Sequence, residues 1–206
     1  MRKIYLLLIA LIVFSNSYSQ EVYFLTGSNI TTYHFSSEQG SMTTPLQSGT
    51  GNMFEMGYTR PLINKRFSHT IGVNLNEYNA VAGNLANSYK WNTKYLGVNN
   101  SINYLVPITT NFKLDIKAGI NLSTIVYGRQ EINGAFYDLK DQDEFSGLNF
   151  MPYTGLHLRY KINDMGYFSF GYGLSRSLIL FNISQEKLTT STNQILFGIH
   201  FNINKK

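Results

Sequence analysis

Hydrophobic and polar residues alternate with a period of two along most of the chain. In residues 112–127, the even positions from Phe112 to Val126 are mostly apolar, and the odd positions from Lys113 to Ser123 are mostly polar. Because successive side chains of a strand point to opposite faces, this period predicts a strand rather than a helix. The same alternation predicts seven more strands, within 22–33, 53–60, 67–78, 93–106, 148–161, 166–180 and 192–203.

The connections between these strands alternate in length. Long links are expected at 36–51, 79–92, 128–147 and 181–191, and short turns at 61–66, 107–111 and 163–165. Long loops at one end and tight turns at the other are typical of outer-membrane barrels, whose tilted strands need about 9–11 residues to cross a bilayer. The sequence therefore predicts an all-β fold, an eight-stranded antiparallel up-and-down transmembrane β-barrel with extracellular long loops and periplasmic termini.

The polar faces of these strands indicate which side meets lipid. They consist mainly of Gly, Ser, Asn and Thr, and only 14% of all residues are charged, against about 25–35% on a soluble surface. We therefore expect the apolar faces to point outward and the polar faces to line the lumen. A secreted, soluble, lipocalin-like barrel that binds an apolar ligand is the alternative, and it requires the reverse orientation. Aromatic residues near the strand ends are expected to form a periplasmic girdle: Tyr58, Phe67, Tyr104, Phe112, Tyr160 and Tyr167.

The first residues have the three parts of a secretory signal. Arg2 and Lys3 precede an apolar run over 4–14, and Ser17 and Ser19 follow it at small-x-small spacing. This predicts a signal peptide over 1–19, cleaved after Ser19, and an outer-membrane barrel domain over 20–206. Cleavage removes two positive charges from a net charge of +5, so the basic balance does not indicate a nucleic-acid partner. The absence of Cys excludes disulfides and Cys-ligated metals.

Five ionisable residues fall on the predicted lumen face. A buried charge needs a partner, so a structural network of ion pairs that plugs the barrel is the favoured interpretation. A gate or a proton relay is the alternative. Eight strands enclose a space that side chains fill, and no diffusion pore is expected. The five residues are Glu55, Asp115, Lys117, His157 and Arg159.

Other candidate sites carry weaker patterns. His34, Ser36 and Glu38 have the composition of the Ser, His and acid used by eight-stranded lipid A deacylases, but not their sequence context, and no enzyme activity is expected. His69 and His200 are expected to be isolated, and no His pair has metal-site spacing, so no cofactor or metal is predicted. Four acidic residues of the segment 129–147 favour a solvated outer loop, and divalent-cation bridging to lipopolysaccharide is the alternative. They are Asp138, Asp141, Asp143 and Glu144.

Several short segments resemble the outer-membrane β-barrel domain of Bacteroidetes, the PorT-like family. The resemblance implies a non-enzymatic eight-stranded outer-membrane barrel. Outer-membrane lipid, lipopolysaccharide and, during biogenesis, the barrel-assembly machinery are the expected partners. We therefore expect a structural, adhesive or assembly- and secretion-linked role, with a lipid-modifying outer-membrane enzyme as the alternative. The segments are Tyr95-Leu-Gly-Val98, Tyr104-Leu-Val-Pro107, Asn111-Phe-Lys-Leu114, Ala118-Gly-Ile-Asn121, Tyr153-Thr-Gly155, Gly166-Tyr-Phe-Ser169, Gly171-Tyr-Gly-Leu174 and Ile195-Leu-Phe-Gly198.

Overall fold

The computed structural model describes residues 20–36, 47–62, 66–83, 88–140, 142, 145, 147–178 and 187–203. The predicted signal peptide lies outside these residues. Within them, no helix is long and apolar enough to cross a membrane. The strands are β1 (Gln20–Ser36), β2 (Gln47–Pro61), β3 (Phe67–Gly83), β4 (Ser88–Pro107), β5 (Phe112–Ile132), β6 (Ala135–Asp138), β7 (Leu148–Asn163), β8 (Gly166–Arg176) and β9 (Lys187–Ile203).

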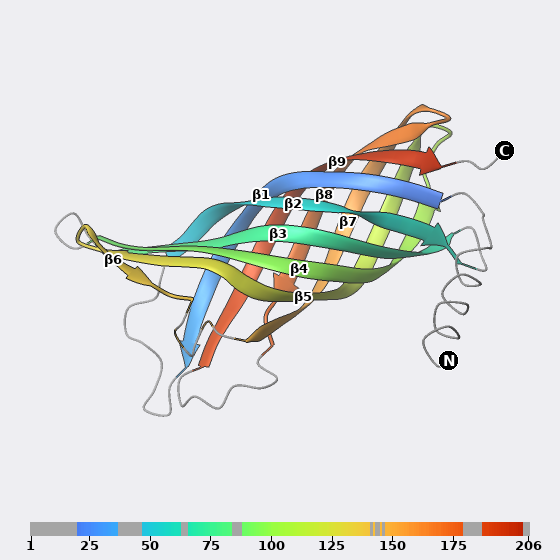
Figure 1. The fold of residues 1–206 in the computed structure, drawn as a ribbon. Coiled ribbons are helices and arrows are strands. Elements are labelled where there is room, and N and C mark those ends of the chain that lie inside the picture. The colour runs from blue at the N-terminus through green and yellow to red at the C-terminus, as the bar shows by residue number, and fades with distance from the viewer. Residues whose placement is uncertain are drawn as a thin grey trace, which may run out of the picture.

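Eight of these strands form a closed antiparallel ring, which confirms the predicted fold. Each pairs with its neighbour along the chain, β5 pairs with β7, and β1 closes the ring against β9. Figure 1 shows β1 beginning and β9 ending at the same end of the barrel. Short connections join strands at that end, which we call the turn end, and the opposite end is the loop end.

The register of the ring fixes the tilt of its strands. From Phe24 on β1, the paired residues can be followed around the ring in either direction until they reach β5. The path through β2, β3 and β4 ends at Leu122, and the path through β9, β8 and β7 ends at Phe112, so the ring closes with a stagger of ten residues. With strands about 4.8 Å apart and a rise of about 3.3 Å per residue, this stagger corresponds to a tilt of about 40°. Such a tilt lies within the range of transmembrane barrels.

Apolar side chains cover the outside of the ring, as the alternation predicts. Phe54 is 55% exposed and Val98 is 45% exposed, whereas their chain neighbours Glu55 and Asn99 are buried in the lumen. Most outward positions in the middle of the other ring strands are apolar as well, whereas β1 has Thr26 outside and Leu25 inside. A soluble lipocalin-like barrel requires a polar outer face, so the exposed apolar side chains contradict that alternative.

The aromatic girdle at the turn end is partly as expected. Outside the barrel, the rings of Phe67 and Tyr104 lie 4.9 Å apart, and those of Phe112 and Tyr160 lie 5.0 Å apart. Tyr167 is an exception, because it occupies a lumen-facing position of β8 and stacks with cationic side chains inside the barrel. The prediction that Tyr167 belongs to the outer girdle was therefore wrong, because its side chain faces the lumen.

The link predicted at 79–92 is mostly strand. β3 continues to Gly83 and β4 begins at Ser88, with Ala80 and Trp91 buried inside the barrel. Most outward positions there are polar, including Asn92, which made the segment resemble a loop. A strand that passes beyond the lipid meets water on its outer face, so the change from apolar to polar marks the membrane boundary.

The link predicted at 128–147 contains a hairpin. β5 runs to Ile132 and pairs with β6 across Asn133 and Gly134, whose φ angles are 50° and 84°. Asn-Gly is the preferred pair for a two-residue turn with both φ angles positive. Figure 1 shows this hairpin and the ends of β3 and β4 projecting together beyond the other strands.

Candidate functional site

Polar and aromatic side chains fill the lumen in three layers. A charge layer lies near the turn end, a layer of Asn and Gln amides lies at mid-barrel, and an aromatic layer lies near the loop end. Inward positions on every ring strand contribute to them. Any functional site inside the barrel must use these layers.

The charge layer is centred on the guanidinium of Arg159. It donates a hydrogen bond to Glu21 and lies 3.8 Å from a carboxylate oxygen of Asp115. Nδ1 of His200 donates to the other oxygen of Glu21 at 2.6 Å. These side chains come from β7, β1, β5 and β9, so the layer ties opposite walls of the barrel together.

Tyr167 covers this layer on the side of the turn end. The guanidinium carbon of Arg159 lies 4.7 Å from the centroid of its ring, and Nζ of Lys113 lies 4.9 Å from it. Nζ of Lys113 also donates to the Tyr167 hydroxyl at 3.2 Å. Cations over an aromatic face are stabilised by the ring quadrupole.

A continuous chain of hydrogen-bonded amides crosses the middle of the lumen. Gln194 donates to Asn29 at 2.8 Å, and Asn29 donates to Asn76 at 3.1 Å. Asn76 then donates to Asn74 at 2.8 Å, and Asn74 donates to Asn121 at 3.1 Å. Each inner amide both donates and accepts, so these buried groups compensate one another.

Glu55 lies beside the amide chain, away from the charge layer. Its carboxylate accepts a hydrogen bond from the Tyr23 hydroxyl at 2.7 Å and two from the Asn99 amide at 2.9 and 3.1 Å. Nζ of Lys117 lies 5.3 Å from the centroid of the Tyr23 ring, and the ring of His200 stacks on the same tyrosine at 5.8 Å. Tyr23 therefore connects Glu55 to the charge layer.

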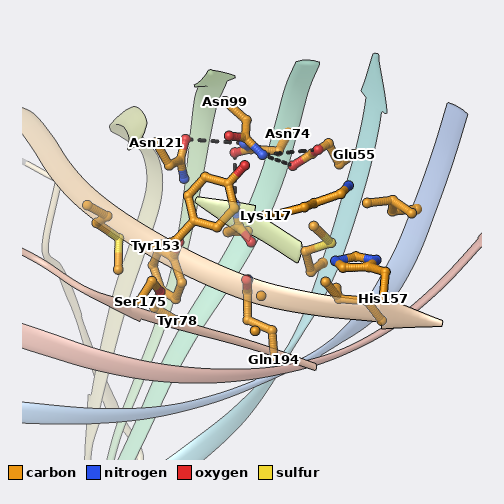
Figure 2. A pocket seen from close by; sticks show the side chains of 17 residues that line it. Glu55, Asn74, Tyr78, Asn99, Lys117, Asn121, Tyr153, His157, Ser175 and Gln194 are labelled. Atoms are coloured by element: carbon orange, nitrogen blue, oxygen red, sulfur yellow. Dashed lines mark hydrogen bonds between the residues drawn. The ribbon is translucent and has the colours of Figure 1, made fainter. Parts of the chain in front are cut away.

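A cavity of about 30 Å³ remains between the layers. Figure 2 shows Glu55, Lys117 and His157 among the side chains that line it. A water molecule needs about 10–15 Å³ of such space, so the cavity has room for two or three waters. This volume does not provide a diffusion path for a solute.

The aromatic layer fills the lumen at the loop end. The rings of Tyr33 and Trp91 meet edge to face at 5.2 Å, and those of Trp91 and Phe145 at 5.1 Å. Tyr78 and Tyr95 pack together at 5.4 Å beneath them. Edge-to-face contacts of this kind favour dense packing over an open mouth.

The structure separates the five predicted lumen residues into groups. Asp115 and Arg159 lie together, whereas Glu55 bonds to neutral donors. Lys117 lies over a tyrosine ring and has no carboxylate within 4.0 Å in the described part of the chain. His157 is opposite Asp115 in the register and packs on β8, where a Cβ atom added to Gly171 would lie 2.6 Å from its Nδ1.

Two members of the charge layer were missed or misjudged from the sequence. Glu21 lies one residue before the predicted first strand, although the alternation continues through it to Gln20. His200 was expected to be isolated, which was wrong, because it contacts Glu21 and stacks on Tyr23. Closure of the ring brings these residues together from opposite ends of the chain.

The charge layer also contains a Ser, a His and a Glu that are hydrogen-bonded in the order found in a serine hydrolase. Oγ of Ser169 and Nε2 of His200 are hydrogen-bonded at 2.9 Å, and Nδ1 of His200 bonds to Glu21. A nucleophile, a base and an orienting acid form such a chain. Ser169 is only 6% exposed, however, and neither it nor His200 lines the lumen cavity.

The set of His34, Ser36 and Glu38 is only partly described. His34 and Ser36 lie two residues apart at the end of β1, where His34 is exposed, and Glu38 lies outside the described residues. Asp138 of the acidic segment caps the amide of Lys140, while Asp141, Asp143 and Glu144 are not described. Among the residues that the structure describes, no group of three His, Asp or Glu side chains could hold a metal ion.

Comparisons with known proteins identify the fold. No protein-family model matches the chain, and no curated protein is significantly similar in sequence. The outer membrane protein OprG from Pseudomonas aeruginosa matches with a TM-score of 0.58 and 10% identity, over 91% of this chain and 97% of OprG. Neisserial surface protein A matches with a TM-score of 0.50 and 13% identity, over 88% and 97% of the two chains. This chain therefore has the fold of small outer-membrane β-barrel proteins.

Proposed function

We propose that this chain is a small integral outer-membrane protein whose role is structural, adhesive or linked to assembly and secretion. The observation that carries the proposal is the filled lumen, in which three layers of side chains leave a cavity of about 30 Å³. In the described part of the chain these layers leave no solute path, and the surfaces left for function are the lipid-facing wall and the loop end. Neither transport by diffusion nor catalysis is part of the proposal.

The absence of a pore is tested by electrical recording. Purified protein reconstituted into planar lipid bilayers is expected to give no stable conductance steps above the bare membrane. The conductance recorded from this chain is compared with that of OprG, or of another structurally similar barrel, prepared in the same way. Regular conductance steps from this chain would contradict the filled lumen.

The sheet at the loop end supports an adhesive role. On its outer face, Nζ of Lys94 lies 2.9 Å from Glu77, Lys90 is opposite Glu131, and Arg129 is opposite Asp138. Such cross-strand pairs of opposite charge stabilise a sheet in water. Phe136 and Tyr137 are both exposed on β6, the edge strand of this sheet.

The adhesive role is tested on whole cells. Replacing Phe136 and Tyr137 by Ser is expected to reduce autoaggregation of cells that express the chain, without changing the amount of protein in the outer membrane. Unchanged autoaggregation would rule out adhesion between cells through β6. The secretion-linked role is then tested by measuring the proteins that a strain without this chain releases into its medium.

The compartment and the orientation are part of the same proposal. We propose a PorT-like barrel of Bacteroidetes type with its signal peptide cleaved after Ser19, its termini in the periplasm and its long loops outside. Lipopolysaccharide and the assembly machinery are its expected partners, and no nucleic acid is expected. Mass spectrometry of the mature N-terminus should identify Gln20, and an epitope inserted after Gly134 should bind antibody on intact cells.

A hydrolase is the second candidate, favoured by the hydrogen-bonded chain of Ser169, His200 and Glu21. A fluorophosphonate probe distinguishes the two, because it reacts with an activated serine. We expect no labelling of the folded protein, since Ser169 is buried. Labelling that Ser169→Ala abolishes would establish the enzyme and overturn the non-catalytic proposal.

A further inference from the structure

The lipid-facing wall carries a polar pair within its apolar band. Nε2 of His69 on β3 donates to Oδ1 of Asn100 on β4 at 2.9 Å. Asn100 is the middle one of the outward-facing positions 96, 98, 100, 102 and 104 of β4. The outward neighbours Val98 and Ile102 are 45% and 44% exposed. A carboxamide in this position faces hydrocarbon rather than water.

The side-chain nitrogen of Asn100 has no acceptor among the described residues of the chain. Hydroxyl groups on the same face avoid this problem, because Thr154 donates to the carbonyl of Lys117 at 3.0 Å and Thr124 to that of Gly147 at 3.2 Å. Hydrocarbon supplies no acceptor, and an unsatisfied amide donor there is costly. Asn100 therefore needs a partner from outside this barrel.

Apolar side chains and one small residue surround Asn100 on the outer face of the barrel. Its cross-strand neighbours are Ile71 on β3 and Ile120 on β5. Ala118, a small residue, lies opposite Ile102 on the same outer face. Between transmembrane helices, small residues let neighbouring segments approach and polar side chains bond across the contact, and we apply the same reasoning to this wall.

The chemistry of the amide identifies the partner. A primary amide carries two donors and an acceptor with two lone pairs, of which His69 uses one. Two such groups related by a two-fold axis satisfy each other reciprocally, as an isologous interface requires. We propose that two copies of this chain associate through the outer faces of β3, β4 and β5, with Asn100 of each copy bonded to Asn100 of the other.

The absence of Cys in the chain allows a direct test in native membranes. With Ala118→Cys, a short bismaleimide is expected to produce a band at twice the mass of the protein. Phe197→Cys is the matched control, because Phe197 is lipid-facing on β9, in the opposite wall of the barrel (Figure 1). Equal crosslinking at both positions, no crosslinking at either, or a product with another protein would each overturn the proposal.

A second variant separates the amide contact from general proximity. Asn100→Leu in the Ala118→Cys background is expected to weaken dimerisation about five-fold or more, and Asn100→Gln is expected to retain it. Migration of unboiled protein on gels shows that each variant is folded. Undiminished crosslinking of a folded Asn100→Leu variant would contradict the role of Asn100.

Discussion

Arg159 is the residue on which the charge layer depends. Its guanidinium contacts Glu21 and lies near Asp115, and both carboxylates are buried. Removing one member of a buried ionic group leaves the others without compensation, which costs more than the pair itself contributes. The layer therefore makes the stability of the barrel sensitive to this single side chain.

Arg159→Met is expected to lower the free energy of unfolding by about 3–5 kcal/mol, because two carboxylates lose their cationic partner. Urea titration of the protein in lipid vesicles measures the change. Lys161→Met is the control, since Lys161 pairs with exposed Asp164 in the turn after β7, and little change is expected there. Equal stabilities of the Arg159 and Lys161 variants would contradict the role of the charge layer.

Gly171 permits the close approach of His157 to β8. Gly171→Ala places a Cβ atom 2.6 Å from Nδ1 of His157 and is expected to cost about 1–3 kcal/mol of folding free energy. Gly173→Ala is the matched control, because its Cβ atom meets the flexible end of Gln194 at 3.3 Å. The same vesicle titration compares them, and a smaller loss for the Gly171 variant would contradict the packing.

The alternation of residues predicted which side chains line the lumen, but not how they pair. Asp115 and Arg159 lie on adjacent strands that the predicted topology already placed together. Glu21 and His200 are brought together by the closing pair of strands, from positions 179 residues apart. The alternation within a short segment indicates the face of each residue, but it carries no information on contacts across the lumen.

At the scale of elements, β4 extends from lipid into water. Val98→Arg in the apolar band is expected to lower folding stability by about 2–4 kcal/mol, and Asn92→Arg, on the same face nearer the loop end, by about 0–1 kcal/mol. Folding titrations in vesicles measure both changes. Equal costs at the two positions would show that Asn92 also lies in hydrocarbon and would contradict the extension beyond the membrane.

The hairpin of β5 and β6 depends on its Asn-Gly turn. Gly134→Val places a β-branched residue at a φ of 84° and is expected to increase amide exchange in residues 129–138. The ring strands should keep their protection. Ala135→Val, next to the turn in β6, should leave the hairpin intact, and unaltered exchange in the Gly134 variant would contradict the turn.

The elements were predicted well where the outer face is apolar and poorly where it is polar. Within the membrane, both the type and the face of each strand follow from the period of two. Beyond the membrane, outward positions hold polar residues such as Asn92 and Arg129. Apolar and polar residues then no longer alternate, and strand could not be distinguished from loop. The Asn133-Gly134 pair was the available indication of the hairpin, and it was overlooked.

At the scale of the whole molecule, the fold is a closed ring with an apolar wall and an interior packed with polar and aromatic side chains. These two properties depend on each other. The paired backbone leaves no open edge in the ring, and the lumen holds together the polar side chains, such as the chain of amides, for which the lipid offers no partner. An integral outer-membrane position follows from this combination more directly than any specific role does.

Cell fractionation with gel electrophoresis tests that position most directly. The protein should remain in outer membranes washed with alkali, and it should migrate faster when unboiled than when boiled, because the folded barrel resists detergent. Release into the soluble fraction by the wash, with one mobility before and after boiling, would contradict an integral membrane barrel.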